Sequence, residues 1–88
     1  MPTLKRGALV DTSVVGDRAI LYHRETRQAI VLNPTGSVLW QQLVEPRTRD
    51  ELARRLCENF PGLEIERAQN DVDAFAADLQ AKKLIEVA

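Results

Sequence analysis

Apolar positions in the first third of the chain fall in short runs separated by turn-forming or charged residues. The runs Ala8–Thr12, Arg18–His23 and Gln28–Leu32 are too short for helices and are rich in residues that favour strands. The segment Ser13–Asp17 is typical of a turn, and the charged segment Arg24–Arg27 joins the second run to the third. Because short polar links between such runs are typical of hairpins, the pattern predicts a three-stranded antiparallel meander.

The pattern changes from strand to helix after the third run, and Asn33 and Pro34 mark the change. An Asn side chain accepts a hydrogen bond from the free N–H groups of a first helical turn. Pro is tolerated there because an N–H at that position would have no intrahelical partner. Pro46 cannot continue a helix, so the first helix is expected between Pro34 and Pro46.

Two further helices are expected in the rest of the chain. Thr48 and Glu51 have the spacing of a capping box, and Pro61 with Gly62 ends the helix that this box opens. A third helix is predicted over about Glu66–Lys83, because apolar residues recur there at helical spacing. Its expected inner face consists of Ala68, Val72, Phe75, Ala76 and Leu79.

The expected order is three strands followed by three helices, with Leu84–Val87 as a short extended tail. No linker, repeat or low-complexity segment divides the 88 residues, so the sequence predicts a single domain over residues 1–88. The expected fold is an α+β domain of winged-helix-turn-helix type, in which a three-stranded antiparallel sheet precedes three helices.

Charge and cysteine content narrow the possible partners and the compartment. Twelve Lys and Arg against thirteen Asp and Glu give a net charge of −1, which does not favour a polyanionic partner. The single cysteine, Cys57, cannot form an internal disulfide. No apolar run has the length of a signal peptide core or a membrane span. We therefore expect a cytoplasmic domain without a membrane partner.

Residues that could perform chemistry are few and isolated. The only histidine, His23, falls at the end of a predicted strand and has no partner at catalytic or metal-ligand spacing. Cys57 has no neighbouring base that would activate it. The four glycines are scattered, so no phosphate-binding loop is present. The sequence predicts a protein that is not an enzyme and has no catalytic residue, metal or cofactor.

A winged-helix type of fold first suggests binding to DNA, and the charges argue against it. The segment from Glu64 to Asp78 contains five acidic residues and one basic residue, Arg67. A protein that contacts several phosphates gathers Lys and Arg on one face. Nucleic acid is therefore not an expected partner, and DNA binding is retained only as an alternative.

The third predicted strand offers a different surface. Gln28–Leu32 contains no charge or proline, the features by which natural sheet edges usually avoid pairing. The strand could be covered by the amino-terminal segment or by a second copy of the chain. It could instead be an edge on which a peptide adds a further strand. Sequence alone leaves open which residues point their backbone groups outward. The outward set is either Ala29 and Val31, or Gln28, Ile30 and Leu32.

The junction between the third strand and the first helix reads Leu-Asn-Pro-Thr-Gly from Leu32, with Trp40 downstream. The third helix contains the run Val-Asp-Ala-Phe-Ala-Ala-Asp-Leu after Asp71. Over about Ala8–Val87 these segments resemble the coenzyme PQQ synthesis protein D family. Its members include the leader-binding domains, or recognition elements, of ribosomally made and modified peptides.

This resemblance implies a winged-helix-like fold in which a precursor's leader adds antiparallel to the third strand and fills the groove beside the third helix. On this chain the implied contact set is Gln28, Ala29, Ile30, Val31, Leu32, Asp71, Phe75, Asp78, Leu79 and Lys82. For Phe75 and Leu79, placement in the core instead of the groove remains open.

Within the family, the chain is most similar to the small stand-alone proteins of lasso-peptide pathways. The implied partners are a precursor leader peptide, a separate leader peptidase and a cyclase. The alternative within the family is a PQQ pathway protein that holds its precursor peptide for a radical enzyme.

Overall fold

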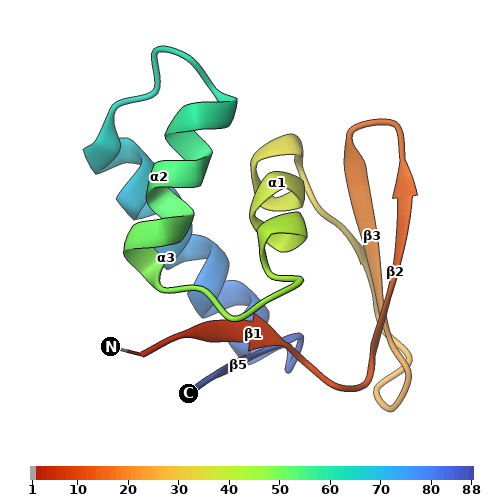
Figure 1. Cartoon of the computed structure of the whole chain (residues 1–88). Helices are drawn as coiled ribbons and strands as arrows, with labels where there is room; N and C mark the ends of the chain where they lie inside the picture. Colours follow the sequence, from red (N-terminus) through yellow and green to blue (C-terminus); the bar gives the residue numbers. More distant parts are fainter. Residues whose placement is uncertain (1) are drawn as a thin grey trace.

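The computed structural model describes residues 2–88 and contains five strands and three helices (Figure 1). The strands are β1 (Leu4–Arg6), β2 (Val10–Val15), β3 (Arg18–His23), β4 (Ala29–Val31) and β5 (Ile85–Val87). The helices are α1 (Pro34–Gln42), α2 (Arg49–Asn59) and α3 (Ile65–Ala81). The α+β fold, with three antiparallel strands in one sheet and three helices, is confirmed.

The three-stranded sheet has the order β2-β3-β4, and both pairings are antiparallel. Strand β3 has the predicted bounds, whereas the expected end of the first strand at Thr12 is wrong. Strand β2 continues to Val15, which pairs with Arg18. Only Gly16 and Asp17 form the turn, because a two-residue hairpin needs a residue with positive φ and Gly16 adopts φ +63°.

The ends of the chain form a second sheet that the sequence did not predict. Strands β1 and β5 pair antiparallel, with Leu4 opposite Val87. Leu4 also exchanges two backbone hydrogen bonds with Arg47, of 2.7 and 3.0 Å, in the loop between α1 and α2. The amino-terminal segment therefore does not cover β4, which was one of the explanations considered for the apolar third strand. Within residues 2–88, β4 pairs with β3 alone.

The first two helices begin at the predicted signals. Asn33 Oδ1 accepts from the Gly36 N–H at 2.7 Å, which caps α1. Thr48 and Glu51 exchange both hydrogen bonds of a capping box, at 3.1 and 3.2 Å, at the start of α2. Helix α1 ends at Gln42, four residues before Pro46, and α3 occupies Ile65–Ala81 instead of about Glu66–Lys83.

The core lies between one face of the three-stranded sheet and the helices. Leu21 of β3, Trp40 of α1 and Val72 of α3 are fully buried within it. The Ser37 hydroxyl accepts from the Ala19 N–H at 2.8 Å and so holds α1 against the sheet, close to the end of β4. Among the described residues, no helix has both the length and the apolar character needed to cross a bilayer.

Candidate functional site

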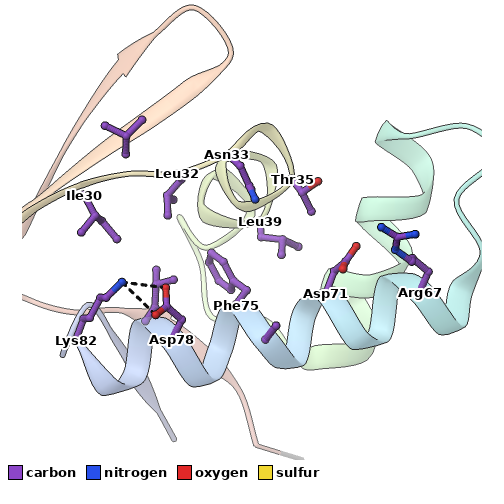
Figure 2. Close-up of a pocket in the computed structure, with 13 residues that line it drawn as sticks. Ile30, Leu32, Asn33, Thr35, Leu39, Arg67, Asp71, Phe75, Asp78 and Lys82 are labelled. Carbon is purple, nitrogen blue, oxygen red and sulfur yellow. Dashed lines mark hydrogen bonds and ion pairs between the residues drawn. The ribbon is translucent and has the colours of Figure 1, made fainter.

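A groove of about 520 Å³ runs between β4 and α3, with the first turn of α1 at one end (Figure 2). The strand and the junction that follows it contribute Ile30, Val31, Leu32 and Asn33. Helix α1 contributes Thr35 and Leu39; α3 and the residue directly after it contribute Arg67, Asp71, Ala74, Phe75, Asp78, Leu79 and Lys82. Eight of the ten residues in the predicted contact set line this groove, and Gln28 and Ala29 do not.

The backbone of β4 has one paired side and one free side. The Leu32 N–H donates to the Ala19 carbonyl, and the Gln28 carbonyl accepts from the His23 N–H, both at 2.9 Å. In an antiparallel strand both backbone groups of a residue point to one side, and this side alternates along the strand. The residues that face β3 are therefore Gln28, Ile30 and Leu32, and those that face away are Ala29 and Val31.

The free side of β4 presents two N–H groups and two carbonyl groups. Within residues 2–88, no other segment forms a hydrogen bond with the outward backbone groups of Ala29 or Val31. The side chain of Val31 is 59% exposed, whereas Ile30 is half-buried and Leu32 is buried against the core. The strand is thus anchored by one face, and its outer edge remains available for pairing.

The floor of the groove is apolar and belongs to the core. Phe75 and Leu79 are 7% and 1% exposed and both line the groove, so they serve the core and the groove at once. Leu39 of α1 completes this floor and was not among the predicted site residues. Its helical spacing marks Leu39 as a core position, but only the packing of α1 places it in the groove.

The wall formed by α3 carries four charged residues at helical spacing, namely Arg67, Asp71, Asp78 and Lys82. Lys82 Nζ lies 3.1 Å from Asp78 Oδ1, so these two charges pair with each other. Asp71 is half-buried and Arg67 is exposed. Asp71, Asp78 and Lys82 were predicted from the sequence to lie in the site, whereas Arg67, Ala74, Asn33 and Thr35 were not.

The residues considered for chemistry lie outside this groove. His23 is 5% exposed, and its Nδ1 accepts from the N–H groups of Glu25 and Thr26, both at 3.2 Å. The imidazole therefore stabilises the turn between β3 and β4. Cys57 is a half-buried free thiol on α2. Within residues 2–88, no three His, Cys, Asp or Glu residues are grouped as metal ligands.

Two solved structures share this fold. One is described as "TbiB1 in Complex with the TbiA(beta) Leader Peptide"; it has a TM-score of 0.86 and 24% sequence identity, and the match covers 93% of this chain and 94% of that one. The other is "Lasso peptide synthetase B1 complexed with the leader peptide", with a TM-score of 0.81, 16% identity and coverage of 94% and 96%.

The sequence itself has no match among curated proteins. Residues 18–85, which contain β3, β4, all three helices and the entire groove lining, match the family described as Coenzyme PQQ synthesis protein D (PqqD). This chain belongs to that family.

Proposed function

We propose that this protein binds the leader segment of a ribosomally synthesised precursor peptide, as an antiparallel strand added to β4. The observation that carries the proposal is the free backbone edge at Ala29 and Val31 beside an apolar groove. Membership of the PqqD family supports it, and both structures with the same fold are complexes with leader peptides.

The two parts of the site contribute differently to binding. The outward groups of Ala29 and Val31 offer four ladder hydrogen bonds, each contributing about 0.5–1.5 kcal/mol net. Such bonds accept any peptide sequence, because every residue except proline carries the same backbone groups. Specificity therefore comes from side chains of the leader that enter the groove over Phe75 and Leu39.

The protein acts without chemistry of its own in this proposal. Its buried histidine supports a turn, its thiol lies on α2 away from the groove, and the groove contains neither residue. The bound leader is presented to a separate leader peptidase and then to a cyclase of a lasso-peptide pathway. Lasso peptides are favoured over the PQQ pathway because a lasso peptide synthetase B1 has this fold.

Amide hydrogen exchange measured by NMR tests the proposal directly. The ligand is a synthetic leader peptide of a lasso-peptide precursor. Saturating leader is expected to protect the amides of Ala29 and Val31, because their outward N–H groups become ladder donors. The matched control is the opposite edge of the same sheet, where the amides of Thr12 and Val14 should exchange as before. Equal protection at both edges, or none at β4, would show that the leader does not pair with this strand.

A further inference from the structure

Asp71 differs from the other carboxylates in the charged wall and its surroundings. It is half-buried in the wall of the groove, and within residues 2–88 it forms no ion pair or side-chain hydrogen bond. Neighbouring carboxylates of α3 are exposed and paired: Asp73 with Arg49 at 2.8 Å, and Asp78 with Lys82 at 3.1 Å. A partly desolvated carboxylate is stabilised by a cation or by hydrogen-bond donors.

Glu51 is the other half-buried carboxylate of the described chain, and unlike Asp71 it has polar partners. Glu51 accepts a backbone hydrogen bond in the capping box and lies 3.6 Å from Arg47. Asp71 has no equivalent. Arg67, one turn earlier on α3, is exposed and makes no ion pair with Asp71 in the part of the chain described. An Arg placed four residues before an Asp is also the less favourable order for a helical pair.

The direction of the groove relates Asp71 to the apolar floor. In Figure 2, Arg67 and Asp71 lie at the end beside Asn33 and Thr35, and Lys82 lies at the end beside Ile30. Helix α3 therefore runs opposite to β4. A strand added antiparallel to β4 runs in the same direction as α3, so it passes Asp71 before it passes Phe75.

The spacing along the strand follows from the geometry of the two elements. Asp71 and Phe75 are four residues apart on α3, which corresponds to about 6 Å along the helix axis. Two residues of an extended strand cover about 6.7 Å, and side chains two apart point to the same side. A peptide residue opposite Asp71 and the second residue after it can therefore both face the groove.

Resting on the leader-binding function, we propose that Asp71 selects a Lys or Arg of the leader, placed two positions before the apolar side chain that covers Phe75. The cation would supply the partner that Asp71 lacks within the chain. The preferred order is basic, any residue, apolar, read from the amino to the carboxyl end of the leader.

Selection from a phage-displayed library of random dodecapeptides tests this on the full chain. Peptides enriched on the wild-type protein should carry Lys or Arg two positions before a large apolar residue. With Asp71→Asn this basic preference should fall to the library frequency, and Asp71→Lys should select Asp or Glu there instead. The matched control is Asp73→Asn on the same helix, which lies outside the groove and should keep the wild-type preference.

Synthetic peptides then give the size of the effect. Replacing the selected Lys by Gln should weaken binding to the wild-type protein about tenfold, equivalent to about 1.4 kcal/mol. The same replacement should change binding to Asp71→Asn less than about threefold. Thermal melts check that the Asp71→Asn and Asp71→Lys variants fold, as expected because Asp71 forms no ion pair or side-chain hydrogen bond within residues 2–88.

The outcomes separate this inference from the function on which it rests. Enriched peptides that compete with the leader for β4 but show no basic preference overturn the role of Asp71 alone. The reverse order, with the basic residue after the apolar one, overturns it as well. Failure to enrich any peptide that pairs with β4 counts against both proposals. In that case the amide exchange experiment decides on the leader-binding function, which is retained only if the leader protects the amides of Ala29 and Val31.

Discussion

The two edges of the three-stranded sheet differ in what lies beside them. Strand β2 is six residues long, and by the same alternation its outward residues are Val10, Thr12 and Val14. Figure 1 shows β2 on the outside of a hairpin, away from α3. Strand β4 is three residues long, but α3 and the start of α1 form a groove next to it.

This difference shows why the shorter edge is the better candidate for peptide binding. Both edges offer unpaired backbone groups, and such groups by themselves do not distinguish one peptide from another. Only β4 combines them with an apolar floor at Phe75 and Leu39 and with a charged wall on α3. A selective peptide site needs both, since the pockets decide which side chains are accepted.

The largest expected effect concerns how each edge is anchored to the core. Leu32→Ala should lower the free energy of unfolding by about 2–5 kcal/mol, because the buried side chain at the end of β4 is lost from the core. Val14→Ala removes a side chain that is 54% exposed and should change the free energy of unfolding by no more than about 0.5 kcal/mol. Urea denaturation measures both. Equal effects would mean that the two edges are anchored alike.

Proline substitutions at matched valines compare the two edges in binding. Val31→Pro removes an outward N–H from β4, and Val14→Pro removes one from β2, so neither interrupts pairing with β3. Fluorescence anisotropy measures leader binding. Val31→Pro should weaken binding at least about tenfold, which corresponds to about 1.4 kcal/mol, whereas Val14→Pro should bind like the wild type.

Thermal melts of both proline variants are the control, because proline also fixes φ and can lower stability without touching the binding edge. A modest loss of stability at either position is compatible with the proposal. A folded Val31→Pro variant that binds the leader normally would remove β4 from the binding site.

A smaller effect is expected from salt. Binding through backbone bonds and apolar side chains releases few condensed ions, whereas binding to phosphates gives a steep dependence on salt. The affinity for leader should therefore fall only weakly between low and moderate ionic strength, because only one ion pair, at Asp71, is proposed. Titration with random duplex DNA is the comparison, and tight duplex binding with a steep slope would favour the DNA-binding alternative.

The smallest expected effect lies away from both edges, at the capping box of α2. The backbone hydrogen bond from Thr48 holds the pKa of Glu51 below its ordinary value of 4.5. Because the folded-state pKa is the lower one, ionised Glu51 stabilises the fold above the unfolded-state pKa. This contribution is lost as the pH falls through the folded-state pKa.

Glu51→Gln should accordingly flatten the rise in thermal stability over the acidic range while leaving leader binding at neutral pH unchanged. Melting curves from acidic to neutral pH measure it, with Glu58→Gln on the exposed face of the same helix as the control. An equal flattening in both variants would mean that the capping box is not the cause.

The elements of this fold follow largely from local sequence signals. Asn33 with Pro34 began α1, and Thr48 with Glu51 began α2, because a cap satisfies N–H groups only three residues away. The bounds of β3 were also predicted from its own residues. Such signals act within one or two turns of the chain, and tertiary contacts did not override them here.

The site depended on contacts that no local pattern contains. Pairing of β1 with β5 joins opposite ends of the chain and leaves β4 uncovered, although the apolar pattern of β4 was compatible with either arrangement. The outward direction of Ala29 and Val31 was decided by the register with β3, because a shift of one residue would exchange the two sides of the strand. Leu39 and Arg67 reached the groove only through the packing of α1 and α3, which the periodicity of each helix alone does not specify.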